Sequence, residues 1–287
     1  LMFFTDTGRV YVERVFQIPE GSRIAKGRSI KNLLNLQPEE KIASVLRIEA
    51  VGNEDKDATF VEDRFVLFAT RSGKVKKTKL SDFRNYRKDG IIAIKIEEGN
   101  SLIDVKLTDG NDEISLVTSQ GYSVRTSEEN IRPMGRPSAG VAGVRPGEGD
   151  YLVALAVVDN SEQLLVVSEK GLGKRTPFED YPTKGRGGKG VITMKVTEKT
   201  GRVVKALRVA AEDDIMLMTD TGQSVRIKAE SARLTGRNAQ GVILMKTKDG
   251  EAIQDIARVV NEDDEGGEAE STDAEGTTPP VEEQEQD

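Results

Sequence analysis

Residues 184–190 bring four glycines and three cations together, in the order Lys184-Gly185-Arg186-Gly187-Gly188-Lys189-Gly190. Because glycine has no Cβ, such a loop adopts positive φ easily and lets another surface approach its backbone closely. Its amides and its three side-chain charges would suit a run of phosphates. For one isolated loop, the alternative is a basic turn that is simply solvated between two strands.

Similar loops recur along the chain, and each ends in a glycine that leads into a β-rich run. The closing glycines are Gly90, Gly140, Gly190 and Gly241, with a weaker copy at Gly27. Their successive spacings are 63, 50, 50 and 51 residues, and the long first interval holds an insertion at residues 50–57. A second motif, an apolar run followed by a hydroxyl residue, two spacers and glycine, lies upstream of each copy and ends at Gly8, Gly73, Gly121, Gly171 and Gly222. Two motifs in fixed phase indicate a repeat architecture.

Each repeat contains four short runs rich in Val, Ile, Leu and Thr, which are typical of strands. In one repeat these runs are residues 140–145, 151–158, 163–168 and 171–175. Single helical turns are expected at 127–131 and 228–232. Four strands per repeat of about 50 residues predict an all-β fold, a propeller-like ring or spiral of four-stranded blades. We expect the first blade to be incomplete.

Residues 1–260 are expected to form one domain, followed by an acidic tail at 261–287. The whole repeats are 27–89, 90–139, 140–189 and 190–240, and partial repeats lie at 1–26 and 241–260. The two partial repeats could pair to close a five-bladed ring, or stay apart as open sheet edges.

The acidic tail contains 12 acidic residues and no basic one, so it is expected to be disordered. The whole chain carries a net charge of −7, but residues 1–260 contain 42 basic and 37 acidic side chains, a net of +5. A mildly basic body suggests a polyanionic ligand. The tail would then be a tethered competitor for that ligand, or only an aid to solubility.

Composition excludes several classes of function. The 287 residues include no cysteine and no histidine, which excludes disulfides and the usual zinc sites and removes the commonest general base. The absence of cysteine fits a reducing cytoplasm. No apolar run approaches the roughly 20 residues that span a membrane. We find no nucleophile–base pair, no nucleotide-binding glycine loop and no metal cluster, so we expect no catalytic or metal-binding residues.

Aromatic residues make up 5% of the chain and do not interleave with the basic motifs. This distribution argues against stacking platforms for single-stranded nucleic acid. Phe16, Phe83 and Phe178 follow the basic strands and are expected to pack between blades.

Cations cluster in the recurring loops and on the strand after each upstream glycine. In a ring they would form a belt on one rim, which would hold a nucleic-acid backbone without reading bases and would bend duplex DNA around the curve. The alternative is that they form the solvated face of each strand. The loop candidates are Lys184, Arg186, Lys189, Arg136, Arg237, Arg28, Lys26, Arg87 and Lys88, with the backbone of Gly185, Gly187, Gly188 and Gly190. The strand candidates are Lys74, Lys76, Lys77, Arg125, Lys174, Arg175 and Arg226.

Several runs carry a resemblance to a known family. They include Gly8-Arg9-Val10-Tyr11, Gln17-Ile18-Pro19-Glu20, Gly173-Lys174-Arg175-Thr176, Tyr181-Pro182-Thr183-Lys184 and residues 236–244. With these runs, residues 1–260 and the acidic tail resemble the C-terminal DNA-wrapping domain of bacterial DNA gyrase A subunits, which are type II topoisomerases. Residues 184–190 are similar to the family's Gln-Arg-Arg-Gly-Gly-Lys-Gly box. The resemblance implies that the main box belongs to an earlier blade, before Leu1.

The resemblance implies a β-pinwheel that wraps double-stranded DNA and supports ATP-dependent negative supercoiling by the holoenzyme. Its partners would be the gyrase B subunit together with the remainder of the gyrase A subunit, in an A2B2 assembly of the bacterial cytoplasm and nucleoid, with no membrane. Catalytic residues, ATP and Mg²⁺ would belong to the holoenzyme, and this chain would hold no cofactor. The alternatives are the corresponding domain of topoisomerase IV, whose repeats are typically more degenerate, and a propeller scaffold that docks an acidic protein.

Overall fold

The computed structural model describes residues 1–21, 27–49, 60, 63–248 and 250–259. Lys26, the insertion at 50–57 and the acidic tail therefore lie outside the described residues.

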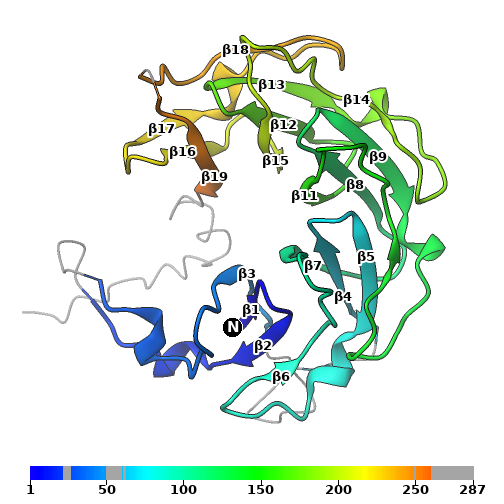
Figure 1. The fold of residues 1–287 in the computed structure, drawn as a ribbon, viewed down its shortest axis with the longest axis vertical. Helices are drawn as coiled ribbons and strands as arrows, with labels where there is room; N and C mark the ends of the chain where they lie inside the picture. The colour runs from blue at the N-terminus through cyan, green and yellow to red at the C-terminus, as the bar shows by residue number, and fades with distance from the viewer. Residues whose placement is uncertain (22–26, 50–59, 61–62, 249, 260–287) are drawn as a thin grey trace, which may run out of the picture.

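Five antiparallel sheets follow one another around an arc (Figure 1). Four of them have four strands each, in the orders β3 (Ile42–Leu46), β1 (Met2–Thr5), β2 (Arg9–Val12), β6 (Ile91–Ile92); β7 (Leu102–Thr108), β4 (Phe65–Thr70), β5 (Lys74–Lys79), β10 (Val141–Ala142); β11 (Leu152–Val157), β8 (Glu113–Thr118), β9 (Tyr122–Ser127), β14 (Val191–Ile192); and β15 (Val203–Val209), β12 (Gln163–Ser168), β13 (Leu172–Pro177), β18 (Val242–Ile243). The fifth sheet has the order β19 (Ile253–Val259), β16 (Asp214–Thr219), β17 (Ser224–Lys228). We call these sheets blades one to five. The predicted all-β fold with repeated blades is confirmed.

The outermost strand of each four-stranded blade follows the middle strands of the next blade along the chain. β14 follows β13 of blade four, yet Val191 pairs with Ser123 of β9 in blade three. In the same way β10 follows β9 but pairs with β5, through Val141 and Val75. Each recurring basic loop therefore runs from one blade to the outer edge of the preceding blade.

The hydrophobic core is divided among the interfaces between neighbouring blades. Phe4 of blade one meets Phe68 of blade two edge to face, with ring centroids 5.5 Å apart, and neither side chain is exposed. Leu67 on the other face of β4 joins Leu116 of blade three in a separate cluster. The middle strands of a blade are consequently buried on both faces rather than on one.

Short 3-10 turns follow the middle hairpins. The two predicted helical turns are present as η4 (Glu128–Asn130) and η6 (Ala229–Ser231), and η3 (Leu80–Phe83) and η5 (Phe178–Asp180) take the same place in blades two and four. Phe83 and Phe178 are fully buried, as predicted. The prediction for Phe16 is wrong: it lies in η1 (Val15–Gln17) and is 77% exposed, because no described segment packs over it.

The two ends of the described chain stay apart. Blade one has its four strands, contrary to the predicted incomplete first blade, because β1 and β2 are completed by β3 and β6. The blade with only three strands among the described residues is the fifth, where β17 forms the outer edge. Figure 1 shows the arc open between blades one and five, so the two partial repeats do not pair in the described part of the chain.

Candidate nucleic-acid interface

The loop at residues 184–190 is held on the outer edge of blade three by its own backbone. The Lys184 amide donates to the Arg125 carbonyl at 2.9 Å, and the Gly187 amide donates to the Gly143 carbonyl at 2.6 Å. These two amides are occupied and are not phosphate donors. Lys184, Gly185, Arg186, Gly188 and Lys189 are all exposed on the outer side. The loop therefore presents charge and small residues to solvent over an ordered backbone.

The closing glycine of this loop is required by blade packing. Gly190 has φ of 87°, and a Cβ there would overlap the carbonyl oxygen of Ser123. Gly140 and Gly241 are placed in the same way against Val75 and Gly173. By contrast, nothing lies within 4 Å of a Cβ built at Gly185. The surface that approaches Gly190 is thus the neighbouring strand, whereas Gly185 leaves room for a ligand.

Each recurring basic loop after the first contacts the segment that follows the preceding one. We call residues 87–90, 135–140, 184–190 and 236–241 the rim loops. The Lys95 amide, just after the first rim loop, donates to Ser138 of the second at 3.1 Å. Arg186 of the third rim loop donates to the Ala142 carbonyl at 3.1 Å. Gln240 of the fourth donates to Thr197 at 3.1 Å. The rim loops form one continuous band across blades one to four.

Apart from Arg28 and Lys26, the predicted loop cations all lie within the rim loops. Most are exposed, and Arg136 and Arg237 are half-buried; Lys26 lies outside the described residues. Arg28 is exposed but belongs to the segment that leads to η2 (Ile30–Asn32), which adds no outer strand to another blade. Lys189 places its Nζ 4.6 Å from the centre of the Tyr122 ring, a cation–π distance that orients the lysine on the rim.

The expected place of the strand cations on an exposed rim is largely wrong, because these side chains bind protein instead of solvent. Lys77, Arg125 and Arg175 occupy the fourth position after the upstream glycine and are buried. Each donates to a backbone carbonyl of the next blade. The pairs are Lys77 Nζ to Glu128 O at 2.9 Å, Arg125 Nη1 to Phe178 O at 2.7 Å, and Arg175 Nε to Ala232 O at 2.9 Å. They join neighbouring blades.

Lys76 and Lys174, one position earlier on their strands, are also fully buried. Their ammonium groups donate to carbonyls of the rim loops, so they cannot contact phosphates directly. Lys74 is half-buried and paired with Glu97. Arg226 is the exception at the fourth position: it is half-exposed and paired with Asp214 on β17, the outer edge of blade five.

Sequence reasoning missed one set of exposed cations. Lys95, Arg145, Lys195 and Lys246 each stand five residues after a closing glycine, and all are exposed. Their common phase was visible in the sequence and could have identified them. The outer strands also expose one apolar side chain each in blades one, three and four, at Ile92, Ile192 and Ile243 (52%, 41% and 56%).

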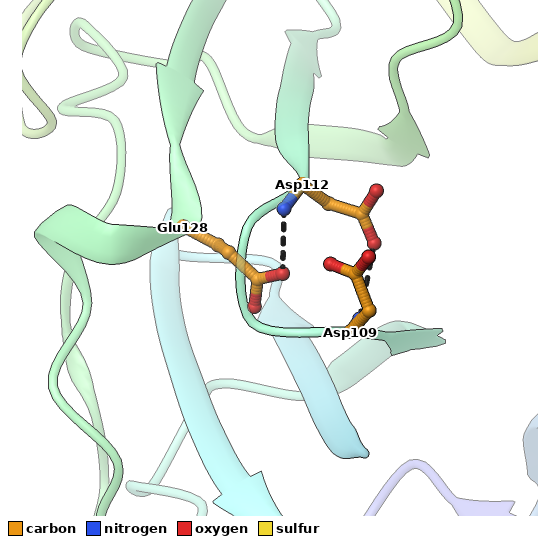
Figure 2. A group of neighbouring side chains, drawn as sticks. All are labelled: Asp109, Asp112 and Glu128. Atoms are coloured by element: carbon orange, nitrogen blue, oxygen red, sulfur yellow. Dashed lines mark hydrogen bonds between the residues drawn. The ribbon is translucent and has the colours of Figure 1, made fainter. Parts of the chain in front are cut away.

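One acidic group has the spacing of a metal site, formed by Asp109, Asp112 and Glu128 (Figure 2). The buried Glu128 carboxylate already accepts hydrogen bonds from the amides of Gly110 and Asp112, at 2.8 and 3.0 Å. It also accepts from the Thr108 hydroxyl at 2.9 Å. We call this arrangement the Glu128 turn clamp. Because the carboxylate oxygens of Glu128 already accept these hydrogen bonds, the cluster is explained as a device that holds the turn, and no metal is needed.

The fold and the band of rim loops define a class: a β-propeller-like pinwheel that exchanges outer strands between blades and carries an outward cationic edge. Among the described residues, no helix is both long and apolar enough to cross a bilayer.

The chain belongs to the DNA gyrase C-terminal domain family. The family described as "DNA gyrase C-terminal domain, beta-propeller" matches residues 1–49, 64–109, 112–159, 162–210 and 213–259. The DNA gyrase A subunit of Halalkalibacterium halodurans is 49% identical over 96% of this chain, and that of Clostridium acetobutylicum is 42% identical over 92%. These matches cover 32% and 31% of the relatives, so the chain spans about a third of their length.

Two solved structures share the fold. One titled as a DNA gyrase A C-terminal domain has a TM-score of 0.76 at 23% identity, covering 90% of this chain and 82% of its own. One titled as the C-terminal domain of DNA topoisomerase IV has a TM-score of 0.79 at 25% identity, covering 90% and 78%. Because the gyrase A structure is only 23% identical to this chain, its similarity supports the fold alone.

Proposed function

We propose that this chain is the DNA-binding and DNA-wrapping module of a gyrase A subunit. The band of rim loops carries the proposal, because it presents cations in one continuous curve while the blades beneath keep its backbone fixed. Cations on such a curve hold phosphates along a bent duplex, and the bending energy is offset by many contacts. Lys184, Arg186 and Lys189 would be the main contacts, joined by Arg136, Arg237, Arg87, Lys88 and Arg28.

In this proposal the chain performs no chemistry. DNA cleavage, ATP hydrolysis and Mg²⁺ binding would belong to the gyrase B subunit together with the rest of the gyrase A subunit, in an A2B2 assembly in the cytoplasm that acts on the nucleoid. Wrapping by this module would supply the DNA geometry for ATP-dependent negative supercoiling.

The corresponding domain of topoisomerase IV is the nearest alternative. The regular spacing of the rim loops favours gyrase, as do the curated relatives, which are gyrase A subunits over at least 92% of this chain in the two cases above. A scaffold that docks an acidic protein is the second alternative, and the exposed cations alone do not distinguish it.

The test is DNA affinity against salt concentration for the 287-residue chain and for the triple variant Lys184→Ala, Arg186→Ala, Lys189→Ala. Each lost phosphate contact lowers the slope of log K against log salt by about 0.9, so we expect a reduction of two to three units. The matched control is Lys41→Ala, Lys170→Ala, Lys199→Ala, which removes three exposed lysines that lie outside the rim loops. Equal slopes in the two triple variants would overturn this DNA path, and an absence of DNA binding would favour the scaffold.

The acidic tail adds a separate expectation. Its 12 carboxylates would compete with DNA for the cationic rim, so residues 1–260 should bind DNA more tightly than residues 1–287 at low salt. The difference should fade as salt screens both interactions. Equal affinities at low salt would leave the tail as a solubility aid.

A further inference from the structure

Two buried lysines lie directly beneath two of the rim loops. Lys76 of β5 and Lys174 of β13 occupy the same position, three residues after Gly73 and Gly171, and neither exposes any surface. Lysine is almost never fully buried without partners. The side chains therefore need an explanation that involves the groups they contact.

The contacts of both lysines are carbonyl oxygens of the chain that crosses above them. Lys76 Nζ donates to Ala93 O at 2.6 Å and to Arg136 O at 2.5 Å, so it joins the segment after the first rim loop to the second rim loop. Lys174 Nζ donates to Gly236 O at 2.8 Å and to Arg237 O at 2.6 Å, both in the fourth rim loop. In each case one of the bound carbonyls belongs to the arginine of that loop.

The third rim loop lacks this arrangement, because the equivalent position on β9 is Val124. There the loop holds itself: Arg186 reaches back to donate to Asn130 O at 2.9 Å and to Ala142 O at 3.1 Å. The second and fourth rim loops are thus held by a buried lysine of the strand beneath them, and the third rim loop is held by its own Arg186.

We propose that Lys76 and Lys174 are positioning residues for DNA binding, whose ammonium groups hold the carbonyls of the second and fourth rim loops inward so that Arg136 and Arg237 stay on the rim. The proposal rests on the proposed function, since it concerns how that rim meets DNA. Each ammonium also adds a positive charge directly behind a phosphate-binding loop.

The protonation of the two lysines gives the proposal a measurable signature. Burial lowers the pKa of Lys76 to about 7, with Asp82 opposing this shift and Arg136 adding to it; the Phe68 ring centre lies 5.3 Å from Nζ. Burial lowers the pKa of Lys174 to about 8, with Arg237 adding to the shift and Asp180 opposing it. The Thr176 hydroxyl, 3.2 Å from Lys174 Nζ, completes the surroundings.

The composition of the chain makes the titration of these two lysines easy to distinguish from that of other groups. The chain has no histidine and no cysteine, so few other groups change charge between pH 6 and pH 9. DNA phosphates favour the charged form of a nearby lysine, and binding should therefore raise both pKa values. DNA affinity should accordingly fall as pH rises through 7 and 8, by up to about tenfold for each lysine whose pKa rises by one unit on binding.

A purely structural role gives the opposite sign. Because burial lowers the pKa of both lysines, the native chain binds fewer protons than the unfolded chain above about pH 7, and stability rises with pH. If the lysines acted on DNA binding only by stabilising the fold, affinity would be constant or would improve with pH. A falling affinity alongside rising stability is the result specific to the proposal.

The experiment measures DNA affinity of the 287-residue chain from pH 6 to pH 9 at constant ionic strength. The variants are Lys76→Met, Lys174→Met and both together, since methionine keeps the apolar stem and removes the ammonium. We expect the double variant to bind several-fold more weakly at pH 6 and to lose the pH dependence. The matched control, Lys189→Met, should weaken binding but keep the wild-type pH dependence. A flat wild-type profile, or an unchanged profile in the double variant, would overturn the proposal.

A second measurement needs no substitution. The ¹³Cε resonances of the lysines, followed against pH in the intact chain, should show two lysines that titrate near 7 and 8 and whose pKa values rise when duplex DNA is added. Unchanged pKa values in a DNA-bound sample would overturn the proposal while leaving the proposed function intact. A chain that binds no DNA at any pH would instead contradict the proposed function.

Discussion

Lys77 offers a direct test of whether the strand cations hold blades together. Its Nζ lies 2.9 Å from the Glu128 carbonyl and 3.5 Å from the Glu128 carboxylate, across the interface between blades two and three. The two side chains are 5% and 0% exposed. Arg226 has the same place in its repeat, but its ion pair with Asp214 leaves the arginine side chain 50% exposed. The two cations differ in burial and in the place of their partners, because Lys77 reaches the next blade whereas Arg226 pairs within blade five.

The expected loss in the free energy of unfolding depends on which charged group each substitution leaves without its partner. Lys77→Met removes the cation next to a fully buried carboxylate, and breaking a buried pair in this way costs about 3–5 kcal/mol. Three hydrogen bonds from the turn clamp still reach Glu128, so we expect a loss near the lower end, about 3 kcal/mol. Arg226→Met removes a half-exposed arginine from Asp214, which keeps its second ion pair with Lys228 at 3.1 Å, so we expect a loss of about 0–1 kcal/mol.

Urea unfolding followed by circular dichroism measures both losses, and DNA affinity against salt gives the second observable. Because Lys77 is buried against protein, Lys77→Met should leave the salt slope unchanged at a temperature where the variant is folded. Equal destabilisation by the two substitutions would refute the role as a joint between blades. A slope reduced by about one unit in Lys77→Met would refute the exclusion of this lysine from the DNA contacts.

Three further outcomes are expected. Gly190→Ala should lower the free energy of unfolding by at least about 1–2 kcal/mol, because its φ is positive and its Cβ position is occupied, whereas Gly185→Ala should change it by less than about 0.5 kcal/mol; equal effects in urea unfolding would contradict the packing argument. Stability should rise with pH between 6 and 9, by up to about 4 kcal/mol, as Lys76 and Lys174 lose their protons in the native state; a falling urea midpoint would contradict the direction of both pKa shifts. Adding Ca²⁺ or Mg²⁺ should leave the thermal midpoint unchanged, because the Glu128 turn clamp is already satisfied; a rise that saturates with metal concentration would show a site there.

The repeat pattern predicted the strands and their order well because apolar β-branched runs and turn glycines are local signals. It predicted the partners of the outer strands poorly. Val191–Ile192 is a two-residue strand, and nothing in its residues says that it pairs with Tyr122 and Ser123, two repeats earlier, rather than within its own repeat. That pairing is set by the path of the rim loop between blades, which is a property of the assembled arc.

The same limit explains the errors in the candidate site. On β5, residues 75–78 are all buried, although they include Lys76 and Lys77, because blades cover both faces of the strand. A strand with one solvated face would have exposed one of the two lysines, so the sequence favoured surface cations. On β17 the corresponding Arg226 is exposed, because no described blade follows blade five and covers that face.

The recurring cations therefore divide by their position in the repeat. In blades two to four, those three and four residues after the upstream glycine face inward, where they donate hydrogen bonds to carbonyl oxygens of the rim loops and of the next blade. Those within the rim loops, and five residues after the closing glycine, lie at the surface or are half-buried, although Arg186 also donates to the carbonyls of Asn130 and Ala142 and Arg237 to that of Ile192. Only the second group is placed to contact phosphates directly. The path of a bound duplex should accordingly follow the closing glycines around the arc, and the basic strands beneath should determine how rigidly that path is held.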